Sequence, residues 1–206
     1  MAELSTELLN VEQAVKERYA AGAQQAEAAL CCPVEYNPRF LKIIPEEIME
    51  RDYGCGDPSQ HLQPGETVLD LGSGAGKICY IAAQVVGATG KVIGVDMTPD
   101  MLSLAEKYRH SVGEQLGYHN VEFHRGKIQD LRTDLDAADV YLRQHPVSSV
   151  EDFQAFEASM AEQKTRRPLI ANDSVDAVVS NCVLNLVQDT DKRQLFSEIF
   201  RVLRKG

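Results

Sequence analysis

The sequence lacks the features that mark membrane, secreted and nucleic-acid-binding proteins. No apolar run approaches the roughly 20 residues that cross a bilayer, and the N-terminus has no basic start followed by an apolar block, as a secretion signal would. The 206 residues carry a net charge of -10, and an acidic surface argues against nucleic acid or an anionic membrane as a partner. We therefore expect a soluble cytoplasmic protein.

The sequence also lacks any Cys-x-x-Cys pair. Its cysteines are five in number: Cys31, Cys32, Cys55, Cys79 and Cys182. Disulfide frameworks use an even number of cysteines and structural zinc sites use closely spaced pairs, so neither is expected. In a reducing cytoplasm these residues would be free thiols. Cys79 follows the glycine loop on a predicted helix, beside apolar residues, and is interpreted as a packing residue.

From about residue 66 onward, apolar strand patterns alternate with helical patterns. TVLDL, KVIGVD, VEFHR and VDAVVS have the composition of buried strands. This alternation predicts right-handed βαβ units and an α/β fold, a Rossmann-like doubly wound, mostly parallel sheet. Thr98 is expected to cap the helix that begins at Pro99, and a threonine or aspartate to cap the last helix, TDKRQLFSEIFRVLRKG.

We expect the chain to divide into an N-terminal helical lid, residues 1–60, and a core, residues 61–206. The polar segment at about 131–173 interrupts the alternation, and Pro146 divides it into two helical pieces, so it is interpreted as a helical insertion. Gly206 directly follows a helix, where sheets of this kind normally continue. C-terminal strands are therefore expected to be missing.

The segment VLDLGSGAG places Asp70, Gly72, Gly74 and Gly76 between a strand and a helix. A phosphate-binding P-loop needs G-x-x-x-x-G-K-[ST]; here the first glycine stands one position too close to the Gly-Lys pair, and Ile78 replaces the hydroxyl residue. The dinucleotide fingerprint G-x-G-x-x-G is matched only weakly. The loop therefore favours a ligand without a phosphate.

A second acid supports this interpretation. Asp96 ends the next strand, 20 residues past Gly76, where a carboxylate can accept both ribose hydroxyls. Asp70 could hold an ammonium group above the loop, directly or through water. Ribose and ammonium without phosphate describe S-adenosylmethionine, whereas a purely structural glycine turn would leave the two acids unexplained.

The segments VLDLGSGAG, VIGVDM, GKI at 126–128 and EIFRVLRKG resemble class I S-adenosylmethionine-dependent methyltransferases over roughly residues 66–206, apart from the insertion. The resemblance implies S-adenosylmethionine as cofactor and the tip of the third strand as its adenine contact. On this basis the predicted cofactor-binding residues, besides the two acids and three glycines above, are Tyr53, Ser73, Met97, Gly126, Lys127, Ile128, Gln129 and Asn181.

More specifically, YGCG at 53–56, the Cys79-Tyr80 pair and SNCVLNLV at 180–187 resemble the arsenite methyltransferases, from about Cys31 to the end. The resemblance implies that Cys55 and Cys182 hold trivalent arsenic, that Cys32, or its neighbour Cys31, serves a thiol relay, and that a thiol reductant takes part. Thiolates are the soft ligands that suit this element. Its lone pair would attack the sulfonium methyl group without a general base, and no resident metal is expected.

Two other interpretations remain open. The chain could be a methyltransferase for another small-molecule acceptor, with the cysteines incidental. It could also be a truncated, non-catalytic module that binds the cofactor or arsenic without turnover.

Overall fold

The computed structural model describes residues 36–51 and 56–206. These ranges contain one sheet of four parallel strands in the order β3-β2-β1-β4: β1 (Thr67–Leu71), β2 (Lys91–Asp96), β3 (Val121–Arg125) and β4 (Ala177–Ser180). The predicted α/β fold with a parallel sheet is confirmed. Because β2 and β4 lie on opposite sides of β1, the strand order reverses there, and such reversals are where parallel sheets bind ligands.

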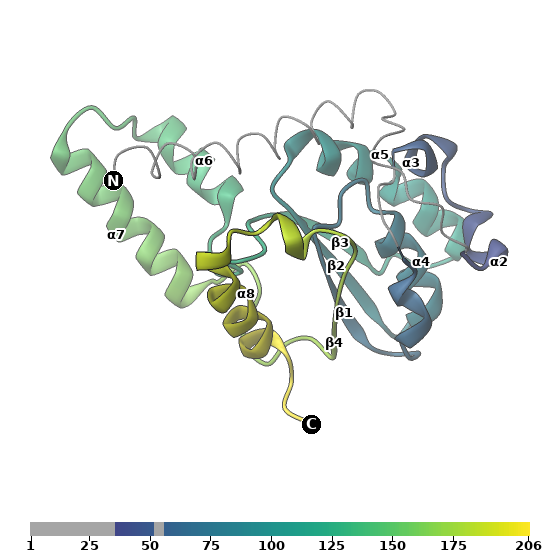
Figure 1. Ribbon diagram of the computed structural model, residues 1–206. Helices are drawn as coiled ribbons and strands as arrows, with labels where there is room; N and C mark the ends of the chain where they lie inside the picture. Colours follow the sequence, from purple (N-terminus) through teal and green to yellow (C-terminus); the bar gives the residue numbers. More distant parts are fainter. Residues whose placement is uncertain (1–35, 52–55) are drawn as a thin grey trace.

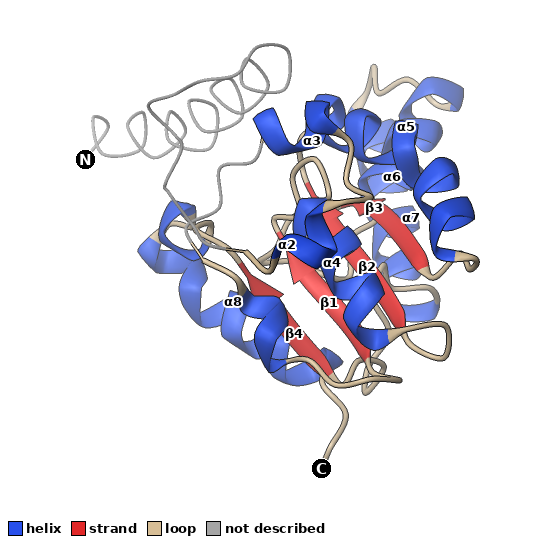
Figure 2. Ribbon diagram, turned by 90° about the vertical axis from the view of Figure 1, so that its right-hand side faces the viewer, coloured by secondary structure: helices blue, strands red, loops and turns tan. Residues whose placement is uncertain are grey.

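Helices cover both faces of the sheet (Figures 1 and 2). On one side lie α2 (Pro38–Leu41), α3 (Glu46–Glu50), α4 (Lys77–Val86) and α5 (Pro99–Leu116); on the other lie α6 (Leu135–Gln144), α7 (Val150–Arg166) and α8 (Asp189–Val202). Two short 3₁₀ turns are η2 (Pro58–His61) and η3 (Leu184–Leu186). In the described ranges, no helix is both long enough and apolar enough to cross a membrane.

Two hydrophobic cores follow from the period-two alternation of the strands. Val68 and Val92 pack in the core on the α4 side, while Leu69, Leu71 and Val95 pack in the core on the α8 side. Side chains alternate between the faces of a strand, so Asp70 points to the same face as Val68. The sheet therefore directs this carboxylate toward α4 and the glycine loop.

The helix starts depart from the predictions in two places. Thr98 stands at the N-cap of α5, as predicted, but its hydroxyl makes no capping bond; its N–H instead donates to Asp96 Oδ1 at 2.8 Å. The predicted threonine or aspartate cap of α8 is wrong, because Gln188 is the N-cap and makes no side-chain bond. Asp189 and Asp191 lie in the first turn instead, where a negative charge interacts favourably with the helix dipole.

Between β3 and β4 the chain forms α6 and α7, and the two helical pieces predicted on either side of Pro146 are present. They lie on the α8 side of the sheet in Figure 1. The guanidinium of Arg125, at the end of β3, pairs with Asp136 and Asp139 and so ties α6 to the sheet. The predicted N-terminal lid, residues 1–60, lies largely outside the described residues. The domain boundaries stay a prediction.

Candidate cofactor-binding site

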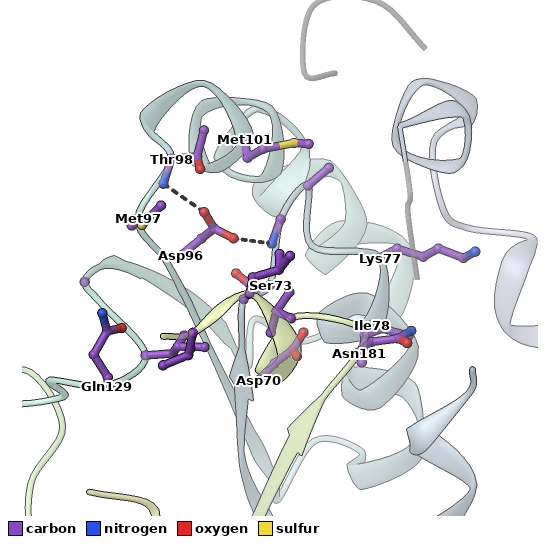
Figure 3. Close-up of a pocket in the computed structure, with 18 of the residues that line it drawn as sticks. Asp70, Ser73, Lys77, Ile78, Asp96, Met97, Thr98, Met101, Gln129 and Asn181 are labelled. Atoms are coloured by element: carbon purple, nitrogen blue, oxygen red, sulfur yellow. Dashed lines mark hydrogen bonds between the residues drawn. The ribbon is translucent and has the colours of Figure 1, made fainter. Parts of the chain in front are cut away.

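A cleft opens at the carboxyl ends of the strands, beside the point where the strand order reverses (Figure 3). Its empty volume is about 1090 Å³, part of which is open solvent. Its lining comes from the glycine loop, the ends of β1 and β2, and the segment that follows β4.

The glycine loop between β1 and α4 forms one wall of this cleft. The N–H groups of Gly72 and Ser73 both donate to the carbonyl of Val95, at 2.8 and 3.1 Å, and so tie the loop to β2. Gly74 has a φ of 52°, and a Cβ placed there would meet no atom within 4 Å. At this position the backbone is open to the cleft, and a ligand can approach it closely.

Two carboxylates flank this loop. Asp70 of β1 is only 2% exposed, and its Oδ2 accepts a hydrogen bond from the Cys79 thiol at 3.3 Å. Asp96, at the end of β2, accepts hydrogen bonds from the N–H of Gly74 on Oδ2, at 2.9 Å, and from the N–H of Thr98 on Oδ1, at 2.8 Å (Figure 3). Both acids line the cleft.

The environment of Asp96 changes its acidity. Burial raises the pKa of Asp96, while the hydrogen bonds from Thr98 and Gly74 act in the opposite direction. Each carboxylate oxygen has a second lone pair, so an oxygen that already accepts a backbone N–H can accept a ligand hydroxyl as well. Asp96 can therefore brace the loop and bind a ligand at the same time.

The rest of the lining is mostly apolar: Met97, Met101, Ile128, Leu186 and Val187. These side chains offer the kind of surface that binds a flat aromatic ring. Together with two acids, one near each side of an open glycine loop, they fit a ligand that combines an aromatic base, hydroxyl groups and a cationic group. Two basic side chains, Arg51 and Lys77, also line the cleft, and Nζ of Lys77 lies 3.7 Å from the centroid of the Tyr36 ring.

Most of the cofactor residues predicted from the sequence line the cleft: Asp70, Gly72, Ser73, Gly74, Asp96, Met97, Gly126, Ile128, Gln129 and Asn181. The structure does not place Gly76 or Lys127 among the lining residues. Gly76 instead stands at the N-cap of α4 with a φ of 86°, and a Cβ there would lie 2.7 Å from Cζ of Phe123. Backbone conformation and packing explain this glycine. Lys127 pairs through its backbone with Asp130. Three predicted residues, Cys32, Tyr53 and Cys55, lie outside the described residues.

Sequence reasoning missed half of the lining, namely Arg51, Ala75, Lys77, Ile78, Thr98, Met101, Val183, Leu186, Val187 and Gln188. Thr98 and Met101 could have been found, since they stand in the first turn of the helix that directly follows the acid Asp96. Val183, Leu186 and Val187 belong to the segment SNCVLNLV, which the resemblance assigns to the arsenic site rather than to the cofactor. Arg51 and Gln188 carry no local signal, because the fold alone brings them to the cleft.

Cys182 follows β4 at the mouth of the sheet, between the lining residues Asn181 and Val183, although its own side chain is not part of the lining. Its φ is 59°, in the left-handed region that few residues other than glycine adopt. The expectation of free thiols is wrong for this residue, since Cys182 is disulfide-bonded. Cys79 is a free thiol, and the other three cysteines lie outside the described residues.

The segment that carries Cys182 is fastened to the N-terminal part of the chain. The carbonyl of Gly56 accepts a hydrogen bond from Asn181 Nδ2 at 2.7 Å and another from the Tyr36 hydroxyl at 3.1 Å. The ring of Tyr36 in turn lies 3.7 Å from Nζ of Lys77, measured to the ring centroid. These contacts place the turn at Gly56 against the end of β4.

Models of methyltransferase domains match residues 62–167 and residues 158–206 of this sequence. The chain belongs to the methyltransferase-domain family. It is 36% identical over 180 residues to the arsenite methyltransferase of Aquipseudomonas alcaligenes, a match that covers 85% of this chain and 42% of that protein. It is 37% identical over 169 residues to the arsenite methyltransferase of Homo sapiens, covering 81% of this chain and 35% of that protein.

The same similarity is seen in three dimensions. The crystal structure of an arsenic(III) S-adenosylmethionine methyltransferase from Chlamydomonas reinhardtii superposes with a TM-score of 0.60 at 32% sequence identity. The match covers 85% of this methyltransferase-domain chain and 47% of the algal one. The chain thus spans less than half the length of these relatives.

Proposed function

We propose that this methyltransferase domain transfers a methyl group from S-adenosylmethionine to trivalent arsenic held by cysteine thiolates. One observation carries the proposal. Asp70 and Asp96 line the same cleft on either side of an open glycine loop, and Cys182 follows the strand next to β1. The relatives named as arsenite methyltransferases support the choice of acceptor.

The described residues fit the proposed cofactor. Asp70 would hold the ammonium group of the methionine part, and Asp96 would accept hydrogen bonds from the ribose hydroxyls. Met97, Met101 and Ile128 would contact the adenine. When bound there, S-adenosylmethionine supplies an electrophilic methyl group on its sulfonium. The chain's own contribution is to position donor and acceptor, an effect that can lower the barrier by about 7–11 kcal/mol.

The proposed arsenic ligands are Cys55 and Cys182. Gly56 follows Cys55 in the sequence, and its carbonyl accepts the hydrogen bond from Asn181, the residue before Cys182. This bond joins the residue after Cys55 to the residue before Cys182, and it supports the choice of these two cysteines as a pair. Cys32, or its neighbour Cys31, is proposed as a relay thiol on the strength of the resemblance alone.

The oxidation state of Cys182 gives the proposal a further requirement. The thiolate is the form of cysteine that binds a soft metalloid, so the disulfide at Cys182 must be reduced before arsenic binds. The proposal therefore includes a thiol reductant and a reducing compartment, the cytoplasm. Arsenite or a thiol conjugate of arsenic would be the substrate.

Titration of the reduced protein with arsenite tests the proposal, with the thiolate-to-arsenic absorbance as the signal. We expect stoichiometric binding that Cys55→Ser and Cys182→Ser each abolish, while Cys79→Ser retains it because the Cys79 thiol is buried away from solvent. Methyl transfer from labelled S-adenosylmethionine should follow the same pattern. Cofactor binding without arsenic binding would indicate a different acceptor, and binding of both without methyl transfer would indicate a non-catalytic module.

A further inference from the structure

We propose that Cys79 is a positioning residue of the cofactor site, whose thiol orients the carboxylate of Asp70 toward the ammonium group of the cofactor. This inference rests on the proposed function, since it assigns a further residue to the same site. The sequence favours a plain packing role for Cys79. The structure adds a specific polar contact to that packing.

The contact joins α4, the helix after the glycine loop, to β1, the strand before it. Cys79 is the third residue of α4 and fully buried, and its Sγ lies 3.3 Å from Oδ2 of Asp70, which is 2% exposed. Asp70 in turn lines the cleft. The thiol therefore contacts a carboxylate that has one side toward the protein interior and another toward the proposed ligand.

The neighbouring strand leaves space for this thiol. Gly94 of β2 is the register partner of Asp70. A Cβ at Gly94 would lie 2.9 Å from Sγ of Cys79 and 2.8 Å from Oγ of Ser73, both too close for unstrained packing. The missing side chain on β2 leaves the space that the thiol occupies next to Asp70.

The thiol is the hydrogen-bond donor in this pair. Burial, with the nearby charge of Asp70 and the hydrogen bond to it, raises the pKa of the Cys79 thiol well above its ordinary value, so Cys79 keeps its proton. A thiol is a weak donor. It can therefore fix the direction of the carboxylate while leaving most of the negative charge for the ammonium group. A protonated, buried thiol is not a ligand for arsenic.

The test compares two nucleoside ligands in the full chain. S-adenosylhomocysteine carries the ammonium group, whereas 5′-methylthioadenosine has the same nucleoside and sulfur but no amino-acid part. Cys79→Ala removes the donor and Cys79→Ser keeps one. We expect Cys79→Ala to weaken S-adenosylhomocysteine binding by about three- to tenfold, the effect of one lost hydrogen bond. The affinity for 5′-methylthioadenosine should be unchanged, and Cys79→Ser should restore most of the loss. Isothermal titration calorimetry measures all these affinities.

Val86→Ala serves as a matched control, because Val86 is a fully buried residue of the same helix that does not line the cleft. It should lower stability and leave both affinities unchanged. The inference is overturned if Cys79→Ala binds S-adenosylhomocysteine as tightly as the parent, or if it weakens both ligands equally, since packing alone would explain either result. Failure of the proposed function looks different: the parent protein would not bind S-adenosylhomocysteine, or Asp70→Ala would bind it unchanged, and both ideas would then be discarded.

Discussion

Asp96 fastens the glycine loop to the second strand, since its Oδ2 accepts a hydrogen bond from the N–H of Gly74 at 2.9 Å. The two residues are 22 positions apart in the sequence. Oδ1 of the same carboxylate holds the N–H of Thr98 at the start of α5. One side chain thus joins the loop, the strand and the following helix around the cleft, and this arrangement leads to the first prediction.

Binding of S-adenosylhomocysteine should weaken at acidic pH. Burial raises the pKa of Asp96 above its ordinary value of 3.8, and the charged form is the better acceptor for ribose hydroxyls. Affinity should therefore be full above this raised pKa and decline as the pH falls through it. Calorimetric titrations between about pH 4 and 8 check the prediction. Asp96→Asn should bind about tenfold or more weakly at neutral pH, the effect of losing charge-assisted hydrogen bonds, and should lack this decline. An equal decline in Asp96→Asn would contradict the assignment.

Gly94→Ala should damage both stability and cofactor binding. The new Cβ would lie 2.6 Å from Cδ1 of Phe123, 2.8 Å from Oγ of Ser73 and 2.9 Å from Sγ of Cys79. Overpacking of this kind costs about 1–3 kcal/mol of unfolding free energy, which urea denaturation measures. Because Ser73 belongs to the glycine loop, affinity for S-adenosylhomocysteine should fall as well.

Val92→Ala is the control for Gly94→Ala, since Val92 is buried in the core on the same face of β2. It should lose stability through a cavity and keep its affinity for S-adenosylhomocysteine. Unchanged affinity in Gly94→Ala would show that the loop is independent of the packing beneath it.

Cys182 should tolerate glycine better than alanine. In ordinary strands and helices glycine is about 0.5–1 kcal/mol less stable than alanine, but the φ of 59° at Cys182 is unfavourable for alanine and free of strain for glycine. We therefore expect the reduced Cys182→Gly variant to be more stable than Cys182→Ala by about 1 kcal/mol. Urea denaturation under reducing conditions makes the comparison. A more stable alanine variant would mean that the left-handed backbone is not kept in the reduced protein.

Tyr36→Phe should weaken arsenite binding without changing cofactor binding. The substitution removes the hydroxyl that donates to Gly56 and keeps the ring beside Lys77. Loss of this bond should cost about 0.5–1.5 kcal/mol of stability and loosen the turn that follows Cys55. Tyr36 does not line the cleft, so the affinity for S-adenosylhomocysteine should stay the same.

Tyr118→Phe provides the matching control for Tyr36→Phe. Its hydroxyl also donates to a backbone carbonyl, that of Ala83, at 3.2 Å. Neither Gly56 nor Asn181 takes part in this hydrogen bond. It should lose a similar amount of stability and bind arsenite normally. Equal losses of arsenite affinity in both variants would point to general destabilisation.

The sequence by itself determined the sheet and the glycine loop. Apolar runs of strand length in TVLDL and KVIGVD, each followed by a helical pattern, require buried parallel strands with helices outside, and the structure has β1 and β2 at these places. The acids Asp70 and Asp96 could be assigned to the cleft for the same reason, because residues near the carboxyl ends of neighbouring parallel strands meet at one edge. These are local patterns, and they depend on few other parts of the chain.

Only the tertiary structure decided how the side chains around that edge are used. The contact of Cys79 with Asp70, the packing role of Gly76 against Phe123, and the approach of the Gly56 turn to Asn181 each join segments that sequence spacing does not relate. The left-handed backbone of Cys182 and the position of Gln188 at the N-cap of α8 were likewise visible only in the structure. The period of the apolar residues specifies which face of a helix or strand is buried. The partner of each buried atom depends on how the helices and the sheet pack against one another, and only the tertiary structure shows that packing.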